Sequence, residues 1–176
     1  MQYLRPTWDE YFLMFAKLAA TRSTCLSFPV GAIIVKDRQI LATGYNGPPS
    51  GSPHCTEQGF CYEGLETCAS NQAMHSRAVH AEANAIAQAA KHGISTENAI
   101  IYVTLEPCLS CLKLIIAAGI KQVYYETQFP GNAKNPVIES FYDQNLVISK
   151  EIKISHEIIN NAVFSLSYPT SVVKNL

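Results

Sequence analysis

The chain has 176 residues, of which 48% are hydrophobic and 15% are charged, so it has enough apolar material for one folded domain and too much for a disordered chain. Lys and Arg number 13 against 14 Asp and Glu, and the formal net charge of -1 lacks the positive excess that binds polynucleotide phosphates. There is no apolar run of about 18 residues to span a membrane, and the N-terminus lacks the pattern of a signal peptide. We therefore expect a cytoplasmic protein with no membrane and no nucleic-acid partner.

The first predicted elements are a helix and a hairpin. Residues 7–22 start with Thr7 and Glu10, which form a capping-box pair, and continue with apolar residues at helical spacing. Two β-rich runs within 30–46 flank residues 36–38, where polar side chains can turn the chain. These patterns predict a helix followed by a β-hairpin.

A long loop is predicted at residues 47–74, where the composition shifts to Gly, Pro, Ser and Cys without periodicity. Loops of this length are usually functional, metal-bound or disordered. Six Cys could form three disulfides in a secreted chain, but a chain with a sizeable core and no export signal has little need of them. Metal ligation is the better interpretation of these Cys residues.

The second half alternates helices and strands. A helix is predicted from residue 80 to His92 and Gly93, a buried strand at 99–105, a helix from Pro107 to Gly119, and a strand at 121–126. Weaker patterns indicate a short helix and an alternating strand within 135–154, in a C-terminal extension taken as 130–176. Helices on the faces of a mixed sheet, with the hairpin at one edge, are expected in a single domain spanning 1–176.

Two motifs carry metal-binding chemistry: the sequence HAE at residues 80–82 and the sequence PCLSC at residues 107–111. Cys108 and Cys111 are predicted to share one face of the first helical turn, where backbone amides and the helix dipole favour thiolates. Two thiolates with His80 favour zinc and leave its fourth position open, as in catalytic sites.

Glu82 is the candidate catalytic residue. Residues two apart on a helix point to different sides, so Glu82 is not expected to complete the metal shell beside His80. A carboxylate next to a metal-bound water can take its proton, pass it to a ring nitrogen and then help protonate a departing amine. The order HxE followed by PCxxC is also the signature of zinc nucleobase deaminases.

Stretches outside these motifs resemble the deoxycytidylate deaminases, a family with bacterial and phage members. The stretches lie within residues 5–127 and read RPTWDEYF, RSTC, VGAIIV, ATGYNGPPSG and AAGIKQVYY. The resemblance implies a cytidine deaminase-like α/β/α sandwich that hydrolyses dCMP to dUMP and ammonia. It also implies a homohexamer that dCTP activates and dTTP inhibits, with Mg²⁺ on the triphosphate.

The same resemblance assigns roles around the nucleotide. It implies that Asn46 faces the sugar and that the backbones of Ala81 and Glu106 contact the cytosine. It also implies that residues 44–51 border the effector pocket, with Tyr45, Asn46, Gly47 and Gly51 as its candidate residues.

The phosphate site departs from the family pattern. Many relatives have Arg or Lys soon after RSTC, whereas this chain continues with Leu26, Ser27 and Phe28. The remaining candidates for a phosphate contact are Ser23 and Thr24, with Arg22 and the hydroxyl of Tyr124 or Tyr125.

A second, structural zinc is also implied. Cys25, Cys55 and His75 match positions where relatives with an extra zinc have ligands, and the fourth ligand could be His54, Cys61 or Cys68. Ordinary buried Cys and a surface His are the alternative.

Other functions fit parts of the same pattern. A tRNA adenosine deaminase would need a basic surface, which the charge balance disfavours, while a nucleoside or free-base deaminase would differ only in ignoring the phosphate. A structural zinc module that binds nucleotides would have no use for Glu82. Asn46 precedes Gly47, and such an Asn-Gly pair is also typical of a tight turn.

Overall fold

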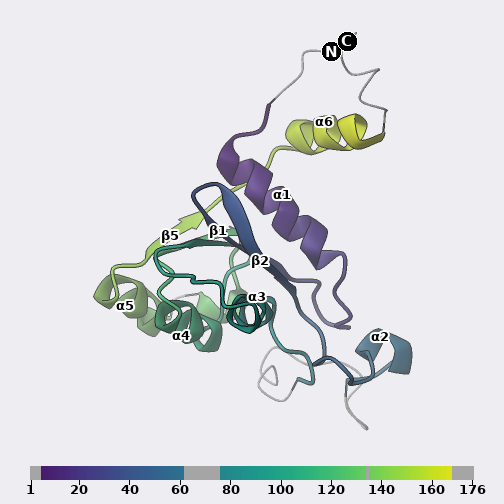
Figure 1. The fold of residues 1–176 in the computed structure, drawn as a ribbon, viewed down its shortest axis with the longest axis horizontal. Helices are drawn as coiled ribbons and strands as arrows, with labels where there is room; N and C mark the ends of the chain where they lie inside the picture. The colour runs from purple at the N-terminus through teal and green to yellow at the C-terminus, as the bar shows by residue number, and fades with distance from the viewer. Residues whose placement is uncertain (1–4, 62–75, 134, 168–176) are drawn as a thin grey trace.

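The computed structural model describes residues 5–61, 76–133 and 135–167. Within them, five strands form one mixed sheet in the order β2-β1-β3-β4-β5 (Figure 1). The strands are β1 (Gly31–Lys36), β2 (Gln39–Tyr45), β3 (Ile100–Leu105), β4 (Gln122–Thr127) and β5 (Ile148–Glu151). The helices are α1 (Trp8–Ala20), α2 (Cys55–Gln58), α3 (Ala81–Lys91), α4 (Leu109–Ala117), the 3-10 turn η2 (Pro130–Asn132), α5 (Pro136–Gln144) and α6 (His156–Ser167).

Helices cover both faces of the sheet, with α1 on one side and α3, α4 and α5 on the other (Figure 1). Strand β1 runs antiparallel to β2 and β3, whereas β3, β4 and β5 are mutually parallel. The predicted α/β/α sandwich with a central mixed sheet is therefore confirmed, and so is the position of the hairpin at one edge.

Local signals explain the first helix and the hairpin. Thr7 caps α1: its side chain accepts a hydrogen bond from the Glu10 amide, and the Glu10 carboxylate accepts one from the Thr7 amide. Asp37 and Arg38 link β1 to β2 with φ angles of 50° and 62°, the positive values that a two-residue type I′ turn needs. The Arg38 guanidinium lies 5.0 Å from the centre of the Trp8 ring, which ties the turn to α1.

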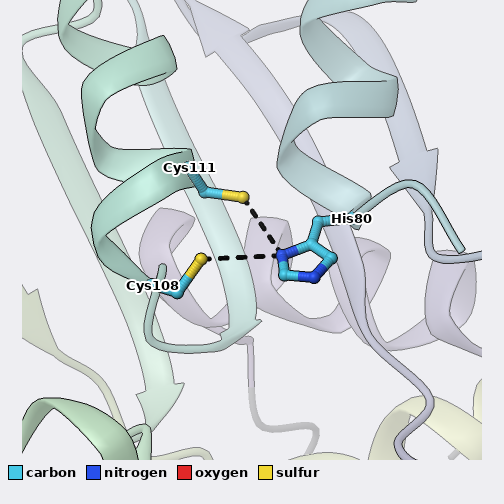
Figure 2. A group of neighbouring side chains, drawn as sticks. All are labelled: His80, Cys108 and Cys111. Atoms are coloured by element: carbon cyan, nitrogen blue, oxygen red, sulfur yellow. Dashed lines mark hydrogen bonds between the residues drawn. The ribbon is translucent and has the colours of Figure 1, made fainter. Parts of the chain in front are cut away.

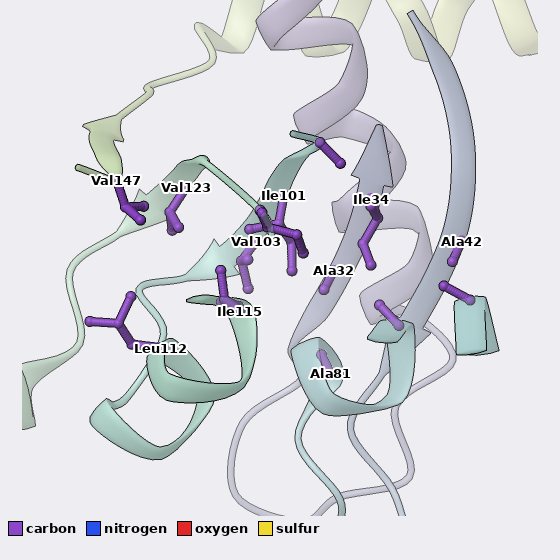
Figure 3. Close-up of a cluster of buried hydrophobic side chains, with 14 of the residues drawn as sticks. Ala32, Ile34, Ala42, Ala81, Ile101, Val103, Leu112, Ile115, Val123 and Val147 are labelled. Atoms are coloured by element: carbon purple, nitrogen blue, oxygen red, sulfur yellow. The ribbon is translucent and has the colours of Figure 1, made fainter. Parts of the chain in front are cut away.

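The larger core lies between the sheet and the helices that carry the candidate site. Side chains of β1, β3 and β4 point toward α3 and α4, and Ala81, Leu112 and Ile115 of those helices are fully buried against them (Figure 3). Gly44 of β2 lets α3 approach closely, because a Cβ at this position would lie 2.1 Å from the Ala81 carbonyl oxygen. The core therefore fixes the N-terminus of α3 against the sheet.

The C-terminal part adds to the same sheet. The weak pattern at 135–154 is confirmed as α5 and β5, and β5 pairs in parallel with β4. Helix α6 follows Ile152 and Ile154, which pack with the α1-side core, and the sequence patterns did not predict it. Among the described helices, none is long and apolar enough to cross a membrane.

Candidate active site

Two helix N-termini meet at the candidate site. His80 is the N-cap of α3 and Cys108 is the N-cap of α4, both with extended backbone, and neither side chain caps its own helix. Cys111 lies one turn further along α4 and is buried. As a result, the three side chains point toward one another across the gap between the helices (Figure 2).

The spacing of these three side chains fits a metal ion. The His80 Nδ1 atom lies 3.6 Å from the Cys108 Sγ atom and 3.3 Å from the Cys111 Sγ atom, and all three atoms lie within 4.8 Å of one another. Tetrahedral zinc with ordinary Zn–N and Zn–S bonds would set an N···S separation of about 3.6 Å. One nitrogen and two sulfur donors therefore stand close to zinc geometry, as the sequence predicted.

One detail of the prediction is wrong. Pro107 and Cys108 are not in the first turn of the helix, because α4 begins at Leu109. The chain is still extended here: the Glu106 amide donates to the Thr127 carbonyl at 2.8 Å, which continues the pairing of β3 with β4. Cys108 thus belongs to the turn before the helix, and its position depends on what holds that turn.

Burial sets the protonation of Glu82. This residue lies in the first turn of α3 and is 4% exposed. Loss of solvation raises the pKa of its carboxyl to about 7, although backbone hydrogen bonds and His80 oppose the shift. A carboxyl with a pKa near neutrality can both accept and donate a proton, which is the property a general base and acid requires.

Neighbouring groups also shift the ligands themselves. The pKa of the Cys108 thiol is lowered, chiefly because the Cys111 thiol donates a hydrogen bond to it, with a further contribution from His80. The pKa of His80 is raised, mainly by its hydrogen bond to Cys108. Cys108 is therefore stabilised as a thiolate, which is the form that binds metals.

Asn46 is buried, and most of its hydrogen-bonding capacity is used within the protein. Its Oδ1 atom accepts from the Ser23 hydroxyl at 2.6 Å and from the Val30 amide at 2.9 Å, and its Nδ2 atom donates to the Phe28 carbonyl at 2.6 Å. The hairpin turn is at residues 37–38, so a hairpin turn at Asn46 is excluded. Asn46 ties the loop before β1 to the end of β2.

The segment with the other predicted effector residues is bonded to the metal site. Gly47 exchanges two backbone hydrogen bonds with Val79, the residue before His80, at 3.2 and 2.9 Å. A Cβ at Gly47 would lie 2.6 Å from the Thr24 Oγ1 atom. Tyr45 is 37% exposed, and Gly51 has a φ of 88°.

The residues predicted near the base and the phosphate divide between the two faces of the sheet. Ala81 begins α3, while Glu106 follows β3 and is buried. Tyr124 lies on the α1 face, packed edge-to-face on Tyr102, and its hydroxyl donates to Gln122. Because side chains alternate along β4, Tyr125 is the one that packs on the α3 and α4 side.

Tyr124 therefore lies on the face of the sheet that α1 covers, and its contact with the substrate stays a prediction. Thr24 and Ser23 lie beside Asn46, and the Thr24 hydroxyl is 3.1 Å from the His54 Nδ1 atom. Arg22 is exposed at the end of α1.

Cys25 and Cys55 of the predicted second zinc site lie near Cys61, one of the candidates for its fourth ligand. Cys55 is buried, and its pKa is raised by desolvation first and then by the nearby Cys61, with a smaller effect of Cys25. Within the described residues, only His80, Cys108 and Cys111 form a set of three ligand atoms as tight as 4.8 Å. His75 and Cys68 lie outside the described residues.

Sequence reasoning missed Asn132, a buried residue whose Nδ2 atom donates to the Pro107 carbonyl at 3.0 Å. It lies 25 positions from Pro107 and outside every motif. No local pattern could have linked the two.

A mixed sheet between helix layers, with a His/Cys/Cys donor set and a buried Glu at two helix N-termini, is the arrangement of zinc-dependent nucleobase deaminases. Residues 6–127 match the family described as the cytidine and deoxycytidylate deaminase zinc-binding region. The chain belongs to this family, whose members are hydrolases.

Particular relatives extend the match. ComE operon protein 2 of Bacillus subtilis (strain 168) is 39% identical over 156 residues, which are 89% of this chain and 77% of that protein. Deoxycytidylate deaminase of Mycobacterium phage D29 is 44% identical over 124 residues, which are 69% of this chain and 95% of the phage protein.

A similar solved structure is the dCMP deaminase from the cyanophage S-TIM5 in complex with dCMP and dUMP. Its TM-score is 0.66 at 30% sequence identity, covering 85% of this chain and 99% of that chain.

Proposed function

We propose that the protein hydrolyses dCMP to dUMP and ammonia. The observation that carries the proposal is the Glu82 carboxyl, which is buried in the first turn of α3, two residues after His80 of the His/Cys/Cys donor set. The substrate class follows from the similar proteins, one named deoxycytidylate deaminase and one solved with dCMP and dUMP. Neither a structural zinc nor buried thiols would require a carboxyl of this kind.

The residues that would hold the metal are His80, Cys108 and Cys111, and their donor set favours zinc. When bound, zinc would supply a Lewis acid that lowers the pKa of a water in the open position. Glu82 would take one proton from the attacking water and pass it to N3 of the cytosine, then take the second proton from the oxygen added at C4 and give it to the departing amine. Water contributes its oxygen to C4 while the C4–N bond breaks, so dCMP and water become dUMP and ammonia.

Around the nucleotide, the backbones of Ala81 and Glu106 are proposed to contact the base. Asn46 has an Nδ2 hydrogen beyond the one it donates to Phe28, and we assign that hydrogen to the sugar. For the phosphate we assign Ser23 and Thr24, because both lie beside Asn46. A phosphate held by hydroxyl and amide donors needs no Arg or Lys in this loop.

The test of this function is a turnover assay with dCMP, CMP, deoxycytidine and a tRNA stem-loop. We expect dCMP to be the preferred substrate, with kcat/KM for deoxycytidine lower by about 100-fold or more because the phosphate contacts are lost. Equal rates for dCMP and deoxycytidine would instead indicate a nucleoside deaminase. Turnover of the stem-loop alone would indicate a tRNA deaminase, and zinc binding without any turnover would indicate a structural module.

Regulation by nucleotides is a second part of the proposal: dCTP activates and dTTP inhibits, each with Mg²⁺ on the triphosphate, in a homohexamer. It is supported by the resemblance of residues 42–51 to the family and by the hydrogen bonds between Gly47 and Val79. An effector held by Tyr45, Asn46, Gly47 and Gly51 would thus act on the segment that ends at His80.

The regulatory proposal predicts that dTTP with saturating Mg²⁺ slows dCMP turnover and that Tyr45→Ala abolishes this response. An unchanged dCMP rate with dTTP would reject it. Sedimentation velocity tests the hexamer directly, and a monomer with and without dCTP would reject that assembly.

A second zinc is proposed at Cys25, Cys55 and His75, with Cys61 as the fourth ligand. Its support is the proximity of Cys55 to Cys61 and Cys25. Elemental analysis should find two zinc ions per chain in the wild-type protein and one in Cys61→Ser. One zinc per chain in the wild-type protein would contradict this second site.

A further inference from the structure

The turn from β3 to α4 is held by two buried polar side chains. The Glu106 Oε2 atom accepts a hydrogen bond from the Phe129 amide at 3.1 Å. The Asn132 Nδ2 atom donates to the Pro107 carbonyl at 3.0 Å. Glu106 and Asn132 are only 6% and 7% exposed, and the bond from Asn132 to Pro107 is buried.

These contacts fix the backbone immediately before a metal ligand. Cys108 follows the Pro107 carbonyl, and its own carbonyl accepts the Leu112 amide at 2.8 Å in the first turn of α4. The turn is thus held on its C-terminal side by the helix and on its N-terminal side by Asn132 and Glu106. Cys111 differs, because it lies within α4 and is positioned by the helix alone.

We propose that Glu106 and Asn132 are positioning residues for the metal centre, which hold the 106–108 turn so that the Cys108 sulfur faces His80. The proposal rests on the proposed metal-dependent function, and it gives Glu106 a side-chain role beyond its backbone contact with the base. Rotation of the peptide after Pro107 would carry Cys108 away, and the bond from Asn132 restrains that rotation. Residues that orient metal ligands typically change metal affinity by about 10- to 100-fold when removed.

The neighbouring Asn135 provides a matched comparison. Asn135 accepts the Val137 amide at 3.1 Å and caps α5, so its hydrogen bond is local to its own helix. Asn132 instead reaches a segment 25 positions earlier in the chain. Both substitutions to Ala remove an amide side chain from the same region, but only one removes a contact to the metal-ligand turn.

The experiment compares Asn132→Ala with Asn135→Ala in the full chain. Zinc affinity is measured by competition with a chromogenic chelator, and the cobalt-substituted proteins are compared by their thiolate charge-transfer absorption. We expect Asn132→Ala to lose about 10- to 100-fold in zinc affinity and to lose much of the intensity due to one of the two thiolates. Asn135→Ala should bind zinc as the wild-type protein does and keep the cobalt spectrum.

Wild-type zinc affinity and an unchanged cobalt spectrum in Asn132→Ala would overturn the proposal. An equal loss in Asn135→Ala would also overturn it, because the effect would then reflect general destabilisation. Glu106→Ala and Glu106→Gln keep the test decisive if Asn132→Ala does not fold. Gln retains an oxygen that can accept from Phe129, so it should lie closer to wild type than Ala in zinc affinity.

Turnover separates this proposal from the proposed function. At saturating zinc, Asn132→Ala should show a lower kcat for dCMP with a smaller change in KM, because the ligand geometry and not the nucleotide contacts are disturbed. If the wild-type protein binds zinc but does not deaminate dCMP, the function fails while the affinity comparison still decides the role of Asn132. If the wild-type protein deaminates dCMP and Asn132→Ala matches it in affinity, spectrum and kcat, only the positioning role fails.

Discussion

Glu82→Gln is the substitution that tests the chemistry most directly. Gln has nearly the same shape, but it can neither take a proton from water nor return one to the amine. General acid–base groups contribute about 10²- to 10⁴-fold to rate, so we expect a loss of kcat in this range or greater. The metal content should not change, because Glu82 is not among the three ligand residues.

The same substitution should stabilise the metal-free protein at high pH. Burial raises the pKa of the Glu82 carboxyl from an ordinary 4.5 to about 7, so the folded chain keeps this proton over a range where the unfolded chain has lost it. The free energy of unfolding therefore decreases, as far as Glu82 is concerned, as the pH rises from 4.5 to 7. Above pH 7 the full destabilisation by the buried Glu82 carboxylate is present. A shift of this size corresponds to a destabilisation of about 3 kcal/mol by the ionised carboxylate. Gln avoids this destabilisation because it carries no charge.

The assay is urea denaturation of metal-stripped wild-type and Glu82→Gln proteins at pH 5 and pH 8. We expect the variant to exceed the wild type by about 3 kcal/mol at pH 8 and by much less at pH 5. Glu157→Gln is the control, because it makes the same carboxyl-to-amide change at an exposed position. A Glu82→Gln advantage that is equal at both pH values would refute the argument from burial, and full dCMP turnover by this variant would refute the mechanism.

Three further predictions concern packing, capping and metal removal. Gly44→Ala should unfold at a lower urea concentration and bind zinc more weakly, because its Cβ would displace the Ala81 backbone next to His80. Gly31→Ala should also lose stability, but with much less effect on zinc affinity, because its Cβ meets the Ala16 carbonyl of α1. Equal losses of zinc affinity in the two variants would contradict this prediction. Thr7→Ala should lower the free energy of unfolding by about 1 kcal/mol in urea denaturation, because it removes the capping box that Thr7 forms with Glu10. The kcat for dCMP should not change, and a changed kcat would show that α1 influences the active site. Removal of the metal with a chelator should abolish dCMP turnover and lower the unfolding temperature of the protein. Added zinc should restore both properties, and added Mg²⁺ should restore neither. Activity that persists in protein shown to be free of metal would exclude a metal-dependent reaction.

The sequence by itself determined the features that depend on neighbours a few positions away. Each of these features involves residues within a few positions of one another: the capping box at Thr7 and Glu10, the hairpin turn, and the HAE and PCLSC motifs. Each is found as predicted, except that α4 begins later than expected. The order of the helices and strands follows from the same short-range patterns, apart from α2 and α6, which they did not predict. The donor residues could therefore be named from the two motifs, whereas the meeting of His80 with Cys108 and Cys111 joins residues 28 and 31 positions apart.

Only the tertiary structure decided how distant segments meet. The face occupied by Tyr124 depends on which side of β4 is covered by α1, and a strand that is apolar on both faces does not reveal this. The bonds of Asn46 to the 28–30 loop and of Asn132 to Pro107 join residues 16 to 25 positions apart, and such contacts leave no periodicity. Cys108 is the N-cap of α4 and not part of its first turn, because the chain up to Glu106 is still hydrogen-bonded to the end of β4, a pairing between segments about twenty residues apart that no local pattern encodes.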